Sequence, residues 1–352
     1  PVLLGGAAIN RRFGRRILFT DSGKAYAPGV FYCKDAFEGL DTMEAIIDGP
    51  KKNALLEKVS REAEMEVGRI KAPNEAVKIQ SRSNIIAAPL PFPEKMGSHV
   101  VKDMPLEAIF QNLNINELYR LSWGAKNTHG EAWEKLKDDF DLRLQRMKKE
   151  ALLEKWLKPQ AVYGFFPCQA DGDELIIYDP VSVATGKPRE SQRMSFPRQP
   201  HDDHLCLADY FSPLQSGIMD VVAFQVVTVG QAATERFDGL QASGDYSEGY
   251  FNHGLAVQTA EATAEYLHRH IRRMLGLKDG QGKRYSWGYP AIPDLEDHRK
   301  VFDLLPIEKE LGMTLTSAFQ LVPEQSTAAI IVHHPQARYY SIGESRVEQL
   351  MK

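Results

Sequence analysis

The chain has 352 residues, of which 43% are hydrophobic and 26% are charged, and its formal net charge is -4. This composition is ordinary for a globular protein, and the length allows two domains or one large domain with an appendage. The small negative charge gives no general attraction to nucleic acid or to an anionic membrane, and no apolar run approaches the roughly 20 residues of a membrane-spanning helix.

The beginning of the chain argues against export. An apolar stretch at residues 1–9 comes before the arginines at 11, 12, 15 and 16, whereas a secretory signal carries its positive charges first. Only three cysteines occur, Cys33, Cys168 and Cys206, and they lie far apart. Their low and odd number favours a reducing compartment over a disulfide framework. We therefore expect a cytoplasmic protein.

The first 60 residues predict part of an α/β fold. Residues 1–8 form a short apolar strand that runs into a glycine turn, and residues 30–34 form a second strand. A helix follows at residues 36–47, with Phe37 and Leu40 on its apolar face. Two strands cannot close a core, and the chain begins with proline, so we expect a domain that is truncated at its N-terminus.

A linker is predicted next. Residues 55–70 are charged and favour a helix, and Pro73, Pro91 and Pro93 then mark an extended segment up to about residue 95. Beyond it, helical periodicity is clear at residues 130–157 and 254–275. Apolar strand-like runs lie at residues 161–166, 174–178, 221–229 and 328–332. Strands and long helices without a regular βαβ alternation predict an α+β fold with an antiparallel sheet.

Residues 284–294 concentrate chemistry in one short segment. Arg284 offers a planar fork for a carboxylate, Gly288 lets backbone come close to a ligand, and Tyr289 adds a flat face and a hydroxyl. The mixture suits a small ligand with a carboxylate at one end and a ring at the other. On chemistry alone an ordinary proline-rich turn is the stronger interpretation.

Other constellations do not reach a functional interpretation. The residues 201–204 (HDDH) lack a third and fourth zinc ligand, and His333 with His334 is typical of a strand end. No G-x-S-x-G elbow or phosphate-binding G-x-x-x-x-G-K-[ST] loop occurs. Cys168 and Cys206 lie in apolar surroundings that favour inert thiols. The basic run at residues 269–273 is typical of a solvated helix face.

An ordered series of motifs points further. The pattern Arg-x-x-x-Gly-Tyr-Pro-Ala-x-Pro-Asp at residues 284–294 resembles the S-adenosylmethionine-binding signature in the reactivation domain of cobalamin-dependent methionine synthases. Further blocks resemble that domain in the same order: FPRQP at 196–200, LCLADY at 205–210, LQASGDY at 240–246, HGLA at 253–256, AEYLH at 264–268, EKELGMTL at 308–315 and HPQARYY at 334–340. The resemblance runs from about residue 100 to the C-terminus.

The resemblance implies a division of the chain into three parts. Residues 1–60 would be the truncated C-terminal part of a Rossmann-like cobalamin-binding domain, because residues 3–8 (LLGGAA) and 35–39 (DAFEG) resemble its last two strand ends. Residues 61–95 would be a helix and a linker that serves as a hinge. Residues 96–352 would be the reactivation domain, with a twisted antiparallel sheet and long helices.

The resemblance also implies the binding residues. Arg284 would pair with the methionyl carboxylate of S-adenosyl-L-methionine, while Gly288, Tyr289 and the backbone around Trp287 would flank the ligand. Glu261 matches a carboxylate that lines the site, and Tyr339 and Tyr340 match a tyrosine pair at the ligand. From the residues alone, Glu261 is an exposed helix carboxylate and the two tyrosines are a paired strand set.

Two positions concern the remaining contacts. The family has an aspartate facing the ligand's amino group, and the best match here is Asn114, a neutral amide that pairs more weakly with an ammonium. Ala36 matches a position that contacts the cobalamin tail. The family's Asp-x-His-x-x-Gly motif, whose histidine ligates cobalt, is absent from this sequence. This fragment is therefore expected to hold cobalamin weakly or not at all.

The resemblance implies a methyltransferase function. The chain would bind S-adenosylmethionine and support reductive methylation of cob(II)alamin, which restores methyl transfer from methyltetrahydrofolate to homocysteine. The upstream cobalamin domain and a flavodoxin-like electron donor are the implied partners. Two alternatives stay open: a freestanding S-adenosylmethionine-binding module that serves a separate corrinoid protein, and an unrelated α+β hydrolase or structural protein whose turn mimics the signature.

Overall fold

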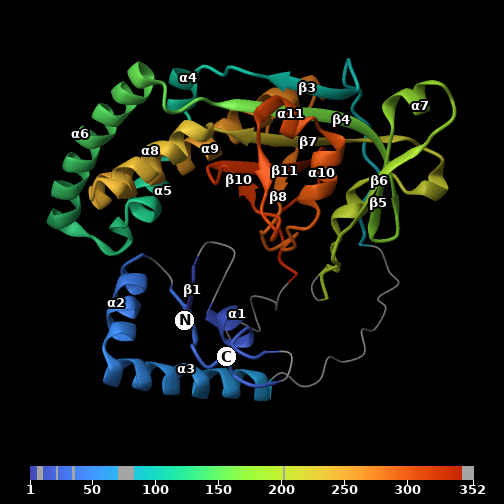
Figure 1. Cartoon of the computed structure of the whole chain (residues 1–352). Coiled ribbons are helices and arrows are strands. Elements are labelled where there is room, and N and C mark those ends of the chain that lie inside the picture. Colours follow the sequence, from blue (N-terminus) through green and yellow to red (C-terminus); the bar gives the residue numbers. More distant parts are fainter. Residues whose placement is uncertain (6–10, 21–22, 34–35, 70–82, 201–202, 343–352) are drawn as a thin grey trace. The chain divides into compact units, whose positions relative to one another are not determined.

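The computed structural model describes residues 1–5, 11–20, 23–33, 36–69, 83–200 and 203–342. The chain divides into two compact units, Pro1–Gln80 and Ser81–Lys352, which Figure 1 shows in blue and in cyan to red. Within the described ranges no helix combines the length and the apolar character that a membrane span requires.

The described residues of the first unit form two short strands and three helices. Strand β1 (Val2–Leu4) pairs in parallel with β2 (Val30–Tyr32), and the helices are α1 (Arg11–Arg16), α2 (Ala36–Ile47) and α3 (Gly49–Arg69). Leu18, Val30 and Ala63 form its small core. Helix α2 has the predicted bounds, and α3 begins six residues before the predicted residue 55. A pair of parallel strands is compatible with an α/β remnant but does not identify one.

The second unit is built on an antiparallel sheet of seven strands. The strand order is β6-β5-β4-β7-β11-β8, and β3 pairs with the first half of β4 on the same edge as β5. The strands are β3 (Gly97–Val101), β4 (Gln160–Asp171), β5 (Glu174–Tyr178), β6 (Glu190–Ser195), β7 (Asp220–Thr228), β8 (Lys283–Ser286) and β11 (Ser326–Val332). Strands β9 (Thr314–Leu315) and β10 (Leu321–Val322) form a separate pair. The predicted α+β class with an antiparallel sheet is confirmed.

The helices of this unit vary widely in length. The two longest are α6 (Gly130–Glu154) and α9 (Tyr246–Met274). The others are α4 (Leu106–Phe110), α5 (Ile115–Glu117), α7 (Pro180–Ala184), α8 (Gln231–Ala242), α10 (His298–Leu304) and α11 (Ile307–Leu311), and short π or 3₁₀ turns lie at Leu118–Ser122, Ala125–Asn127, Leu207–Tyr210 and Leu214–Ser216. Helix α9 lies along β7 and β11 (Figure 1).

Both faces of the sheet are buried. Side chains alternate between the faces of a strand, so on β7 Ala223 packs into the core that includes Leu255 of α9, whereas Phe224 packs into the opposite core with Trp287. This alternation explains why β7 is buried along its whole length and reads as a continuous apolar run.

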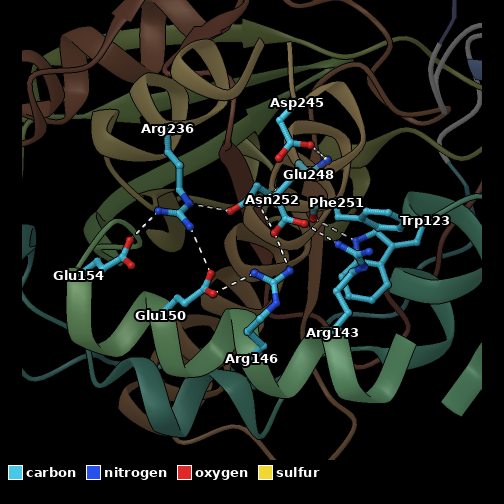
Figure 2. Close-up of polar contacts among 10 residues, drawn as sticks. All are labelled: Trp123, Arg143, Arg146, Glu150, Glu154, Arg236, Asp245, Glu248, Phe251 and Asn252. Atoms are coloured by element: carbon cyan, nitrogen blue, oxygen red, sulfur yellow. Dashed lines mark hydrogen bonds and ion pairs between the residues drawn. The ribbon is translucent and has the colours of Figure 1, made fainter. Parts of the chain in front are cut away.

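Charged side chains join α6 to α8 and α9. Glu248 of α9 accepts hydrogen bonds from Arg143 and Arg146 of α6, the latter at 2.7 Å, and Arg236 of α8 donates to Glu150 of α6 at 3.2 Å (Figure 2). Because these residues lie at the margin of the apolar contact, they fix the position of α6 along α8 and α9 rather than supply its core.

An N-cap sets the beginning of α9. The side chain of Asp245 accepts a hydrogen bond from the backbone N–H of Glu248, which satisfies one of the free donors of the first turn. The helix therefore begins eight residues before the predicted residue 254. Glu261 consequently lies in the middle of a 29-residue helix, over the sheet.

Candidate functional site

The candidate site begins at the edge strand β8. Arg284 is paired with Ile331 of β11, and Tyr285 is paired with Ile330. Ile331 belongs to the core that contains α9, and Ile330 belongs to the opposite core. Because neighbouring residues of a strand face opposite ways, Arg284 points to the side covered by α9 and Tyr285 points away from it.

Arg284 meets Glu261 of α9 there. Its Nη2 donates to Oε2 of Glu261 at 2.9 Å, and the two side chains are 17% and 36% exposed. The other terminal nitrogen, Nη1, is buried and has no hydrogen-bond partner among the described residues. Guanidinium groups favour two parallel bonds with one partner. The fork of Arg284 is therefore only half used by the described residues.

The turn after β8 has a conformation that favours glycine. Gly288 has a φ of +83°, and its N–H donates to the carbonyl of Ile292 at 2.9 Å, so the chain reverses over four residues. Trp287 points inward and stacks on Phe224 with 6.4 Å between ring centroids. Gly288 thus acts through the turn itself, which leaves Tyr289 48% exposed at its tip.

Residues 338–342 form a wall beside this turn, which we call the C-terminal wall. The hydroxyl of Tyr285 donates to the carbonyl of Arg338 at 2.6 Å, and the N–H of Ile342 donates to the carbonyl of Pro290 at 3.1 Å. Tyr339 is 68% exposed, whereas the hydroxyl of Tyr340 is buried and has no hydrogen-bond partner among the described residues.

These elements enclose a cavity of about 520 Å³. Its lining residues are Glu261, Arg284, Tyr285, Ser286, Tyr289, Pro290, Ala291, Tyr339, Tyr340 and Ser341. The volume, and walls in which four of the ten residues are tyrosines beside a few polar groups, are typical of a small-molecule site. A second hollow of about 510 Å³ shares Glu261, Ser286 and Tyr289 with the first and continues past Trp287 and His298.

Burial keeps three tyrosine hydroxyls of the cavity neutral. Burial raises the pKa of Tyr285 and of Tyr340 well above the usual value. Burial also raises the pKa of Tyr289, and the carboxylates of Glu261 and Glu117 add to this effect. These hydroxyls therefore stay protonated at neutral pH, and they serve as hydrogen-bond donors or acceptors rather than as bases.

The structure brings five of the eight predicted residues to this cavity: Arg284, Tyr289, Glu261, Tyr339 and Tyr340. Gly288 shapes the adjoining turn. Asn114 is exposed, and its side chain caps α5 by accepting from the N–H of Glu117 at 3.2 Å. It is not among the described residues that line the cavity. Ala36 begins α2 in the first unit.

Sequence reasoning missed two features of the site. The first is Tyr285, which holds the C-terminal wall and lines the cavity. The second is Glu117, whose negative charge contributes to the raised pKa of Tyr289, although it is not among the described residues that line the cavity. Tyr285 lies inside the signature. A strand predicted at residues 283–286 would have placed Tyr285 and Arg284 on opposite faces of the sheet. Nothing local in the sequence marks Glu117.

The other constellations have structural explanations. Burial raises the pKa of the Cys206 thiol to about 12, and it also raises that of Cys168, so both thiols are poor nucleophiles. His333 contacts the buried Asp220 with 2.7 Å between Nε2 and Oδ1. Across the part of the chain that the structure describes, no group of three or more potential ligand residues could hold a metal ion. Residues 201–202 of the HDDH segment lie outside that part.

Comparison with known proteins gives consistent matches. A family model described as "Vitamin B12 dependent methionine synthase, activation domain" matches residues 99–352. Methionine synthase from Mycobacterium tuberculosis (strain ATCC 25618 / H37Rv) is 32% identical over 392 residues, which cover 97% of this chain and 32% of that protein. Methionine synthase from Mycobacterium leprae (strain TN) is 30% identical over 398 residues, with the same coverage. The chain thus spans about a third of the length of these relatives.

A solved structure is also similar. The crystal structure of the MetH reactivation domain bound to AdoHcy superimposes with a TM-score of 0.66 and 25% sequence identity. The match covers 74% of this chain and 86% of that one. Its mixture of helices and antiparallel sheet is the architecture found in the second unit.

Proposed function

Because this chain belongs to the family of the vitamin B12 dependent methionine synthase activation domain, we propose that it is the reactivation portion of a cobalamin-dependent methionine synthase. In this role it binds S-adenosylmethionine and supports reductive methylation of cob(II)alamin. The enzyme can then resume methyl transfer from methyltetrahydrofolate to homocysteine. The solved relative that is bound to AdoHcy supports a ligand of this chemical class.

The observation that carries the proposal is the half-used fork of Arg284. Its Nη1 is buried and has no hydrogen-bond partner within the described part of the chain, and the Arg284 residue lines a cavity of about 520 Å³. A buried donor without a partner costs roughly 1–3 kcal/mol. A ligand carboxylate bound to Nη1 removes that cost and forms a charge-assisted hydrogen bond. The pair with Glu261 holds the guanidinium in place for this contact.

The remaining walls fit the rest of the ligand. S-adenosylmethionine carries a carboxylate, an ammonium and a sulfonium, so its net charge is positive and complements Glu261. Aromatic faces attract such cations and also pack against an adenine ring, and Tyr289, Tyr339 and Tyr340 offer three of them. Asn114 stays a prediction for the amino end of the ligand.

The proposed task of these residues is positioning. When bound, S-adenosylmethionine would supply an activated methyl group, and this transfer requires no proton to move. The neutral tyrosines and the paired Arg284 accordingly bind and orient the ligand rather than act as acids or bases. The first unit, where Ala36 begins α2, is proposed as the remnant that meets the cobalamin tail.

The proposed partners are the upstream cobalamin domain and a flavodoxin-like electron donor, and the proposed location is the cytoplasm. A freestanding module that serves a separate corrinoid protein finds no support in the comparisons. Both mycobacterial relatives contain the matched region, which covers 97% of this chain, within a much longer methionine synthase.

Equilibrium dialysis with S-adenosylmethionine tests the proposal. The wild-type chain should show saturable binding, and Arg284→Ala should weaken it by about 2–4 kcal/mol because the ligand carboxylate is left unmatched. Arg189→Ala is the control, since Arg189 pairs with Asp179 and is not among the described residues that line the cavity. Absence of saturable binding, or equal affinity of the two variants, would reject the ligand assignment.

A further inference from the structure

The segment that precedes β3 is hydrogen-bonded to other parts of the second unit. Residues 83–86, which we call the strap, have no regular secondary structure and are held at two points. At the first point, Oγ of Ser83 donates to Oδ2 of Asp209 at 2.6 Å. At the second point, both backbone groups of Ile86 are bound: its N–H donates to Oε1 of Gln336 at 3.0 Å, and its carbonyl lies 2.9 Å from Nε2 of His334.

The second anchor adjoins the ligand cavity in sequence. Gln336 stands three residues before Tyr339 and four before Tyr340, which line the cavity. Nδ1 of His334 accepts the N–H of Gln336 at 3.1 Å, and the carbonyl of His334 accepts the N–H of Ala337 at 3.0 Å. One neutral tautomer of His334, with the proton on Nε2, satisfies both ring nitrogens. The strap is thus joined through His334 and Gln336 to residues 334–337, which lead into the C-terminal wall.

The first anchor reaches the same wall from the other side. Asp209 is bound by both terminal nitrogens of Arg198, at 2.6 and 2.9 Å, and its side chain is 1% exposed. Gln199, which follows Arg198 in the sequence, donates from Nε2 to the carbonyl of Ser341 at 3.1 Å. Two separate chains of contacts therefore connect the strap to the two ends of the C-terminal wall.

Packing reinforces these contacts. Ile85 of the strap and Tyr340 of the wall both pack against the same apolar core, which includes Tyr210. The ring of Tyr210 lies 5.7 Å from that of His334. A displacement of the strap would thus remove hydrogen bonds from His334 and Gln336 and apolar contact from the core behind Tyr340.

We propose that His334 and Gln336 are positioning residues for the ligand cavity. They hold the C-terminal wall in its ligand-binding arrangement only while they are also hydrogen-bonded to Ile86 of the strap. The hydrogen bonding of the strap and the binding of ligand are therefore coupled. Coupling is reciprocal: the docked strap raises ligand affinity, and bound ligand tightens the strap. The coupling rests on the proposed function, whereas the grip on the strap does not depend on any ligand.

Amide hydrogen exchange of the full chain without ligand tests the grip. Gln336→Ala removes the acceptor for the Ile86 N–H, whereas Gln336→Glu keeps a side-chain oxygen at that place. Gln336 is exposed, so both variants are expected to fold. The amides of Ile86 and Ile342 should exchange several-fold faster in Gln336→Ala and at the wild-type rate in Gln336→Glu. Wild-type exchange rates at both amides in Gln336→Ala would reject the claim that Gln336 holds the strap in place.

Calorimetry with S-adenosylmethionine tests the coupling. Gln336→Ala should bind about three- to tenfold more weakly, the range expected for loss of one hydrogen bond. Gln336→Glu and the exposed control Gln111→Ala should bind as the wild type does. Saturating ligand should also slow exchange of the Ile86 amide in the wild type.

The failures can be told apart. Unchanged affinity in Gln336→Ala, with normal binding by the wild type, would overturn the coupling and leave the proposed function standing. Absence of binding by the wild type would overturn both the proposed function and the coupling. The exchange rates without ligand would still decide whether Gln336 holds the strap in place.

Discussion

Replacing Tyr340 by phenylalanine should stabilise the ligand-free protein and weaken ligand binding. The Tyr340 hydroxyl is buried without a hydrogen-bond partner among the described residues, and the side chain lines the cavity. Tyr340→Phe keeps the ring in the core and removes only this hydroxyl. If the hydroxyl finds its partner on the ligand, the two effects must have opposite signs.

The magnitude follows from the cost of an unsatisfied polar group. Leaving a buried hydroxyl unpaired costs roughly 1–3 kcal/mol. Tyr340→Phe should therefore raise the free energy of unfolding by about that amount, and each kcal/mol corresponds to roughly 2–4 °C in Tm for a domain of this size. The same cost is relieved when ligand binds the wild type. Affinity should thus fall by roughly 5- to 150-fold in the variant.

Thermal unfolding without ligand and calorimetric titration with S-adenosylmethionine measure the two effects. Tyr339→Phe is the control, because Tyr339 is 68% exposed. Removing its hydroxyl therefore does not change the number of buried polar groups that lack a hydrogen-bond partner. Its Tm should stay unchanged. The reasoning is refuted if Tyr340→Phe lowers the Tm, or if it raises the Tm while affinity stays at the wild-type value.

Three further predictions concern the turn, the ion pairs and the pH dependence. Gly288→Ala should cost about 1–2 kcal/mol in urea unfolding, because φ is +83° and a Cβ would lie 3.1 Å from Leu295; an unchanged midpoint would contradict the strained turn. Glu248→Gln should lower stability by about 1 kcal/mol at low salt through its contacts with Arg146, and the loss should shrink in 1 M NaCl. Burial lowers the pKa of His298 below its unfolded value of roughly 6.5, so the unfolded state binds the proton first and stability is lost as pH falls from about 7. His298→Asn should flatten the dependence of Tm on pH in this range, and an unaltered slope would exclude this histidine as its source.

Elements with a strong local pattern were predictable from the sequence. The structure has α2 and β5 at their predicted bounds, and β7 differs from the predicted 221–229 by one residue at each end. Helical periodicity and continuous apolar runs determine such elements without tertiary context. The short edge strand β8 escaped prediction because its four residues are partly charged, and only pairing with β11 makes it a strand.

The sequence pointed to five residues that line the candidate cavity, but not to the contacts between them. The signature located Arg284, but the pair with Glu261 depends on how α9 crosses the sheet, and 23 residues separate the two in sequence. Gly288 was expected at the ligand, whereas its positive φ places its role in the turn. Asn114 was predicted from the resemblance. In the structure its side chain binds the nearby backbone as the N-cap of α5, and the sequence alone does not decide between that local hydrogen bond and a contact with ligand.

A crystal structure of the full chain with S-adenosylmethionine tests the central claim most directly. The account predicts the ligand carboxylate within hydrogen-bond distance of Nη1 of Arg284, with Nη2 still on Glu261 and the rings of Tyr289, Tyr339 and Tyr340 around the nucleoside. A ligand bound elsewhere, or a carboxylate that leaves Nη1 unpaired, would contradict it.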